Sequence, residues 1–178
     1  MNTLNDTLAT LNEDARDLTR AILESARKNF EDDGRLLPMA FYLPAQGKPV
    51  IVAFDRIDDE TKPRCWDLIR QFRETHPVVL FLTEAWMVRA KDKKPLDFLN
   101  PDGTCKIMPR DHPDREENVT VNLWAGPRTI TFMAGITRNP TALGPWDTLY
   151  DSDFPKSHAA TKVEGALMDG GHFPSQAN

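Results

Sequence analysis

Cysteine is scarce in this chain of 178 residues, which contains only Cys65 and Cys105. Neither belongs to a Cys-x-x-Cys pair, so the sequence indicates neither a zinc knuckle nor a disulfide framework. The first residues also lack a basic segment followed by an apolar one, the pattern of a secretory leader. No apolar run approaches the roughly 20 residues of a membrane span. We therefore expect a soluble cytoplasmic protein with no membrane partner.

An excess of basic charge is absent as well. The chain carries 27 acidic and 22 basic residues, a net charge of -5, and the two signs are mixed along its length. A nucleic-acid groove needs a concentrated basic stripe, which this distribution lacks. An acidic mimic of DNA needs a one-sided array of carboxylates, whereas acidic and basic residues alternate over residues 14–31. We therefore expect no nucleic-acid partner.

Motifs of high chemical specificity are missing throughout the sequence. There is no nucleophile elbow, no Gly-x-Gly-x-x-Gly after a strand and no phosphate-binding loop. A metal site could use Asp111, His112, Asp114 and Glu117. This segment has neither the histidine pair of a zinc protease nor the spaced oxygens and glycine of a calcium-binding loop. The sequence therefore predicts no cofactor and no metal.

A seam of apolar residues at spacings of four and three predicts an N-terminal helix. Its members are Leu4, Leu8, Leu11, Ala15, Leu18 and Ile22. Asn12 can cap a second helix start, which would make the first turns a separate piece, and Gly34 is the natural end. Such a seam suits either packing on the chain's own sheet or a coiled-coil partner, and the short run of heptads favours the sheet.

Alternation of apolar and polar residues predicts two hairpins, the second with its turn at Gly126-Pro127. The strands are expected over residues 39–43, 50–54, 78–90, 119–124 and 130–136. The run 78–82 is wholly apolar and predicts a central strand covered on both faces. A helix over 61–75 is expected before it, with Cys65, Leu68, Ile69 and Phe72 on its buried face.

These elements predict an α+β domain with a mostly antiparallel sheet of about five strands and two packed helices. Beyond Arg138 the composition changes to Pro140, Gly144 and Pro145, without sustained periodicity. We therefore expect a single domain over residues 1–138 and an irregular C-terminal arm over 139–178. Removal of this arm is expected to leave the fold intact but to abolish function.

Glu84 interrupts an apolar strand face, because it shares the side of the strand with Leu80 and Leu82. An unpaired buried carboxylate costs several kcal/mol, so Glu84 needs a counter-charge or hydrogen-bond donors. We expect Arg115 within salt-bridge reach, with a helix arginine as the alternative. A structural ion pair is favoured over a catalytic role.

The connection from residue 90 to 118 is longer than most structureless loops in compact domains. Pro109 and Pro113 stiffen its charged second half, which favours presentation of side chains over the end of the strand that bears Glu84. The candidate binding residues are Glu84, Trp86, Asp111, His112, Asp114, Arg115 and Glu117.

The segment 78–121 resembles a group of small bacterial and phage or prophage proteins. The resemblance rests on the strand FLTEAWMV followed by PRDHPDREENVTV. It covers about the middle third of the chain, its motifs are moderately specific, and it implies no activity. It draws attention to Glu84, Trp86, Pro113, Asp114, Arg115 and Glu117 without assigning a role to any of them.

Two functions remain open from the sequence. The first is a non-enzymatic accessory or interaction protein, of phage or prophage type, that binds another protein through an aromatic and charged surface. The second is a small hydrolase, with or without a metal, that uses Glu84 and the loop from Asp111 to Glu117. In it Glu84 acts as a base, Arg115 holds an anionic group and His112 lies nearby. We favour the first, with a protein as partner, and the sequence leaves the oligomeric state open.

Overall fold

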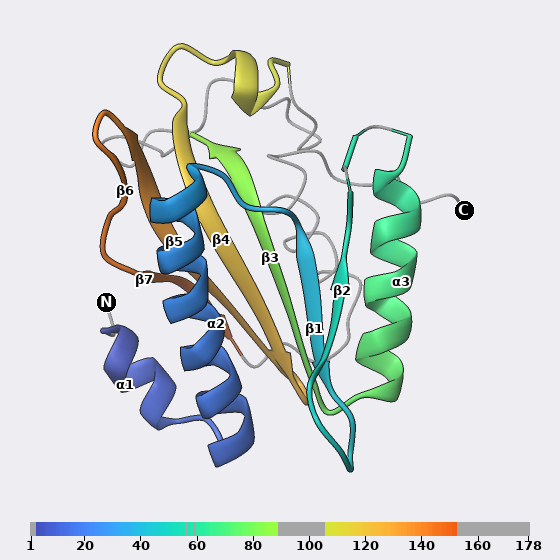
Figure 1. Cartoon of the computed structure of the whole chain (residues 1–178). Helices are drawn as coiled ribbons and strands as arrows, with labels where there is room; N and C mark the ends of the chain where they lie inside the picture. The colour runs from blue at the N-terminus through green and yellow to red at the C-terminus, as the bar shows by residue number, and fades with distance from the viewer. Residues whose placement is uncertain (1–2, 56, 59, 89–105, 153–178) are drawn as a thin grey trace.

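The structure, a computed structural model, describes residues 3–55, 57–58, 60–88 and 106–152 (Figure 1). Within these ranges the helices are α1 (Leu4–Ala9), α2 (Glu13–Asp33) and α3 (Lys62–Thr75), with a short 3-10 helix η1 (Pro109–Asp111). The strands are β1 (Met39–Leu43), β2 (Val50–Ala53), β3 (Val78–Met87), β4 (Glu116–Ala125), β5 (Arg128–Arg138), β6 (Thr141–Leu143) and β7 (Asp147–Ser152). Of the helices in these ranges, none is both long and apolar enough to cross a membrane.

Local hydrogen bonds divide the N-terminal helix where the sequence predicts. The backbone N–H of Ala15 donates to Asn12 Oδ1 at 2.8 Å, which caps α2 and separates it from α1. At the other end Gly34 adopts a φ of 72°, a left-handed conformation that glycine reaches without strain. The predicted second start at Asn12 and the end at Gly34 are both confirmed.

The sheet is antiparallel at every pairing in the described residues, with the strand order β2-β1-β3-β4-β5-β6. β7 also pairs with β5, antiparallel to it. The expected α+β class with an antiparallel sheet is confirmed, and β3 lies inside the sheet between β1 and β4. The sheet has seven strands in the described residues rather than about five, because β6 and β7 both fold back onto β5.

Helices cover both faces of the sheet, which we call the α2 face and the α3 face. On the α2 face Leu80 and Leu82 of β3 pack in one core cluster with residues of α1 and α2, and both are almost fully buried. On the α3 face Val79 and Phe81 pack with Ile69 of α3 in a second cluster. Burial stabilises the fold by about 1.5–3 kcal/mol for each large apolar side chain. The apolar residues of β3 therefore contribute alternately to two cores, as expected for a strand covered on both faces.

The expected domain boundary after Arg138 falls inside the sheet. β6 and β7 follow it and pair with β5, and Leu143 of β6 and Trp146 just before β7 belong to the core cluster of the α2 face. This part of the expected arm is therefore a component of the domain, because its two strands extend the sheet and its large apolar side chains are buried. The rest of the expected arm, residues 153–178, lies outside the described residues.

Candidate functional site

The partner of Glu84 is Arg138 of β5, and the predicted ion pair with Arg115 is wrong. Arg138 Nη2 donates to Glu84 Oε2 at 3.3 Å, and the backbone N–H of Leu36 donates to Glu84 Oε1 at 2.7 Å. The same arginine also donates to Glu117, with Nε at 3.0 Å from Oε2 and Nη2 bonded to Oε1. Glu84 does share the face of β3 with Leu80 and Leu82 as predicted, which is the α2 face, but the counter-charge comes from two strands away.

This charged cluster joins the end of α2 to three strands. Arg138 Nη1 donates to the backbone carbonyl of Gly34, and its guanidinium carbon lies 5.3 Å from the centre of the Phe30 ring. The hydrogen bonds that Arg138 donates to Glu117 raise the pKa of Arg138 above its usual value, with a further contribution from the charge of Glu84. Both oxygens of Glu84 are thus engaged, which favours the predicted structural role of this carboxylate.

The other candidate residues gather around Trp86, at the same end of the sheet. The guanidinium carbon of Arg115 lies 5.2 Å from the centre of the Trp86 ring, and Arg115 Nη1 donates to the carbonyl of His112 at 3.4 Å. His112 is 7% exposed, and its Nδ1 accepts a hydrogen bond from the backbone N–H of Asp114 at 3.1 Å. The ring of His112 therefore supports the turn that leads into β4.

The structure thus brings most of the predicted residues to one end of β3 and β4. Glu117 is the cross-strand neighbour of Trp86 and links the two groups. Asp111 stands apart in η1, where its side chain lies 3.7 Å from Arg110. Among the residues that the structure describes, no three of histidine, cysteine, aspartate or glutamate are grouped so as to hold a metal ion. The first half of the predicted loop, 89–105, lies outside the described residues.

A strip of buried polar side chains lies on the α3 face of β4 and β5. Thr131 Oγ1 donates to Asn122 Oδ1 at 2.8 Å, and Thr120 donates to the carbonyl of Thr83 at 3.3 Å. Asn118 is fully buried, and its Oδ1 has no hydrogen-bond partner within the described chain. Sequence alternation shows these positions as polar, but only the tertiary structure shows that they are buried.

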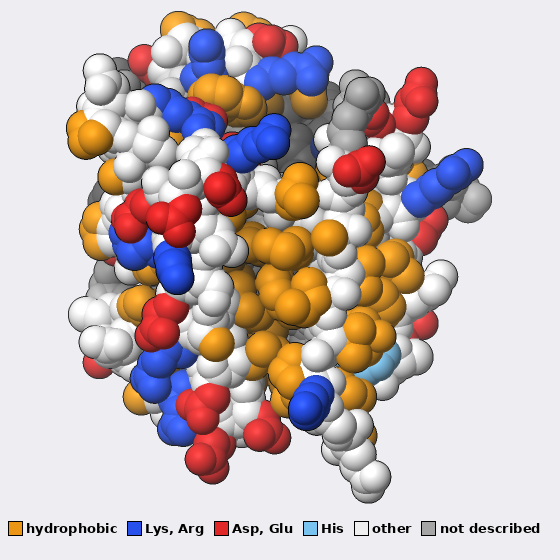
Figure 2. Space-filling model, viewed as in Figure 1, with side chains coloured by type: hydrophobic (Ala, Val, Ile, Leu, Met, Phe, Trp, Pro, Cys, Tyr) orange, Lys and Arg blue, Asp and Glu red, His pale blue; other side chains and the backbone are white. Residues whose placement is uncertain are grey.

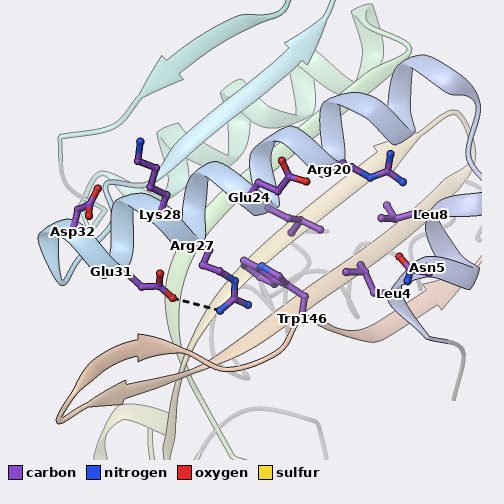
Figure 3. Close-up of a pocket in the computed structure, with 11 residues that line it drawn as sticks. Leu4, Asn5, Leu8, Arg20, Glu24, Arg27, Lys28, Glu31, Asp32 and Trp146 are labelled. Atoms are coloured by element: carbon purple, nitrogen blue, oxygen red, sulfur yellow. Dashed lines mark ion pairs between the residues drawn. The ribbon is translucent and has the colours of Figure 1, made fainter.

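A shallow hollow of about 370 Å³ lies between α1, α2 and Trp146 (Figure 3). Leu4, Leu8 and Leu23 form its apolar part, and charged residues of both signs from α2 surround them. Arg27 donates to the carbonyls of Leu143 and Gly144, so it fastens the segment before Trp146 to the helix. Sequence reasoning missed this hollow, because no local signal pairs the first helix with a tryptophan near the other end of the described chain.

Among the described residues, the two most exposed large apolar side chains lie on the α2 face of β1 and β2 and in the segment before them. Ile51 is 59% exposed and Leu37 is 51% exposed, while Met39 and Leu43 beside them are half-buried. Figure 2 shows this surface as a continuous apolar area between α2 and α3. The β1–β2 apolar surface, as we name it, consists of Leu37, Met39, Leu43, Ile51 and Ala53.

This surface exists because α2 crosses β4 and reaches β6, which leaves β1 and β2 uncovered on the same face (Figure 1). Alternation in the sequence marks Val50, Val52 and Phe54 as the inward positions of β2. Ile51 is also apolar although it occupies an outward position of the strand. This feature of the sequence could have predicted the exposed apolar surface.

Cys65 is a thiol with little nucleophilic character in the folded protein. Its side chain is 4% exposed, and burial raises the pKa of the thiol from 9.0 to about 12. The thiolate is the reactive form, so near pH 8 its population is roughly a thousandfold lower than for an exposed cysteine. The structure therefore assigns Cys65 to the core of the α3 face.

We predict that Cys65 reacts with a thiol-specific reagent at least about a hundredfold more slowly in the folded protein than in urea. The measurement uses the Cys105→Ser variant, in which Cys65 is the remaining thiol, at pH 8. Stability should also fall as the pH rises from 9 toward 12, because the thiol ionises in the unfolded chain first. Equal reaction rates in the two states would contradict the burial of this thiol.

No family model matches this chain, and no curated protein or solved structure matches it either. The resemblance of segment 78–121 to phage-type proteins therefore stays a prediction.

Proposed function

We propose that this protein is a non-enzymatic interaction protein that binds another protein through the β1–β2 apolar surface. The observation that carries the proposal is the exposure of Ile51 and Leu37 beside half-buried Met39 and Leu43. Contiguous apolar patches on a protein surface mark interaction sites, because water contact with them is unfavourable. Covering the exposed part of one isoleucine contributes about 1–2 kcal/mol to binding.

The shape of this surface supports a protein partner over a small ligand. It is open and formed by two strands and the segment before them, whereas small-molecule sites are concave and enclose most of the ligand. Protein interfaces combine an apolar centre with a polar rim. Lys48 and Asp55 flank β2 and provide such a rim.

The charged cluster around Glu84 does not favour the hydrolase alternative. A general base needs a lone pair directed at the substrate, and the Glu84 oxygens accept from Leu36 and Arg138. Arg115, the residue expected to hold an anionic group, instead lies over the Trp86 ring. These contacts support a structural role for the predicted site. The surface that we propose for binding is a different part of the same face.

We predict that a photo-crosslinking phenylalanine analogue at position 51 captures a protein partner in cells that make this protein naturally. The matched control carries the analogue at Ile107, which is 46% exposed and lies outside the β1–β2 apolar surface. A crosslinked product specific to position 51, whose mass includes a different protein, supports the proposal. Identical products from both positions, or no heteromeric product from position 51, would contradict it.

A further inference from the structure

The indole N–H of Trp146 is a buried donor without an acceptor among the described residues. Trp146 is 9% exposed, and the N–H of a buried tryptophan usually donates a hydrogen bond. An unsatisfied buried donor is unfavourable, because it has lost its hydrogen bonds to water and gained none in the protein. Trp146 also lines the hollow between α1 and α2, so this donor lies where a ligand can provide the acceptor.

The position of this donor relative to the hollow is well defined. Figure 3 shows the Trp146 ring across the hollow from α2, with the indole nitrogen on the ring edge that faces the helix. Arg27 of α2 donates to the carbonyls of Leu143 and Gly144, which fixes the backbone just before Trp146. Leu23 on the same helix belongs to the apolar lining. The donor and the apolar lining are therefore held side by side.

The charged residues along the hollow balance each other. Three basic and three acidic side chains of α2 line it, namely Arg20, Arg27, Lys28, Glu24, Glu31 and Asp32. The lining therefore has no net attraction for an anion or a cation, and a charge placed among the leucines would lose its hydration. These surroundings favour an uncharged ligand, with an apolar chain for the leucines and a carbonyl oxygen for the indole N–H.

We propose that this hollow binds a small uncharged acyl compound, an amide or an ester, whose carbonyl oxygen accepts a hydrogen bond from Trp146 Nε1. The apolar chain of the ligand lies against Leu4, Leu8 and Leu23. The volume of about 370 Å³ falls within the range of small-molecule sites, about 300–1,000 Å³. The site is separate from the β1–β2 apolar surface, which lies on the opposite flank of α2 (Figure 1).

α1 is the wall of the hollow that moves to admit the carbonyl group, because Nε1 itself is covered. A helix of six residues is not stable in isolation and depends on its packing against the rest of the chain. The cap at Asn12 separates α1 from α2, so α1 shifts without unwinding the longer helix. Ligand entry therefore requires only a small displacement of α1.

Nuclear magnetic resonance of the full chain tests the assignment, with N,N-dimethylhexanamide as an uncharged probe that has an acceptor and no N–H group. The chain has four tryptophans, and Trp146→Phe identifies the indole resonance of Trp146. We expect the probe to move this resonance to higher frequency with a Kd of about 1 mM or below, because an accepted hydrogen bond deshields the proton. The other three indole resonances should stay in place.

Two outcomes of this titration would overturn the proposal. One is a Trp146 resonance that does not move up to about 10 mM of the probe, ten times the expected Kd. The other is equal movement of all four indole resonances, which would indicate non-specific contact with aromatic side chains.

Two substitutions test the donor and the apolar lining separately. Trp146→Phe keeps an aromatic ring and removes the N–H, so the affinity, followed on the resonances of the probe, should fall about fivefold. Leu4→Lys should lower it at least about tenfold, because an ammonium group then faces the apolar chain. The matched control Ile107→Lys, at a position 46% exposed and outside the hollow, should bind as the wild type does. Unchanged affinity in either hollow variant would contradict the site, and the wild-type titration decides alone if a variant does not fold.

Hexanoate, in which a carboxylate replaces the amide, tests the charge argument. We expect it to bind at least about fivefold more weakly, because the carboxylate loses hydration beside the leucines and meets acidic as well as basic side chains. Hexanoate that binds as tightly as the amide would overturn the assignment of an uncharged ligand. Crosslinking from position 51 does not depend on any of these results, so this proposal and the proposed function fail separately.

Discussion

Replacing Arg138 with methionine is expected to lower the free energy of unfolding by about 2 kcal/mol. The arginine is the counter-charge for Glu84 and Glu117 and also binds the carbonyl of Gly34 at the end of α2. Its removal leaves two carboxylates facing each other with a quarter or less of their side chains exposed. This loss of stability is smaller than is usual when a buried ion pair is broken, because the Arg138 side chain is 46% exposed and solvent screens its charge.

The measurement is urea unfolding of the variant beside Arg110→Met. Arg110 pairs with Asp111 at 3.7 Å on the open surface, and its loss should change stability by less than about 0.5 kcal/mol. The reciprocal change Glu84→Gln should also destabilise the protein, since it weakens one acceptor of the same cluster. A stabilised Glu84→Gln variant, together with a metal-dependent rise in the wild-type melting temperature, would instead support the hydrolase alternative.

A chain that stops after Arg138 is expected not to fold, in contrast with a chain that stops after Ser152. The shorter chain lacks β6 and β7 and loses the buried side chains of Leu143 and Trp146. Truncation of one buried leucine or tryptophan alone costs about 2–5 kcal/mol. The sum is comparable to the whole stability of a typical domain, about 5–15 kcal/mol.

Circular dichroism melts of the two truncated chains provide the measurement. A cooperative transition is expected for the longer chain and none for the shorter one. The comparison isolates residues 139–152, because both chains lack everything beyond Ser152. A shorter chain that melts like the longer one would restore the expected domain boundary after Arg138.

Elements specified by neighbouring residues could be predicted from the sequence. Asn12 and Gly34 act through hydrogen bonds and dihedral angles within their own turns, so the limits of α2 follow from local chemistry. The alternation in both hairpins and the apolar run of β3 likewise reflect burial of strand faces. The same alternation placed Glu84 correctly on the side of β3 that carries Leu80 and Leu82.

The partner of Glu84 could not be predicted, because it depends on how distant strands align. Arg115 directly precedes β4, the strand that pairs with β3, and so is the arginine that the sequence suggests. Its side chain instead lies over the Trp86 ring. Arg138 reaches Glu84 because β5 extends to the same end of the sheet and Glu117 of β4 lies between them. On charge alone several arginines could neutralise Glu84, and only the strand register shows which of them is near it.

The sequence by itself determined the fold class, the helix limits, the two hairpins and the need of Glu84 for a counter-charge, because these depend on periodicity and on contacts within a few residues. The tertiary structure alone decided which arginine meets that need, that residues 139–152 complete the sheet, and that Ile51 stays exposed. Each of these depends on where α2 and the strands lie in space. An apolar side chain is buried or exposed according to what covers it, which local sequence does not specify.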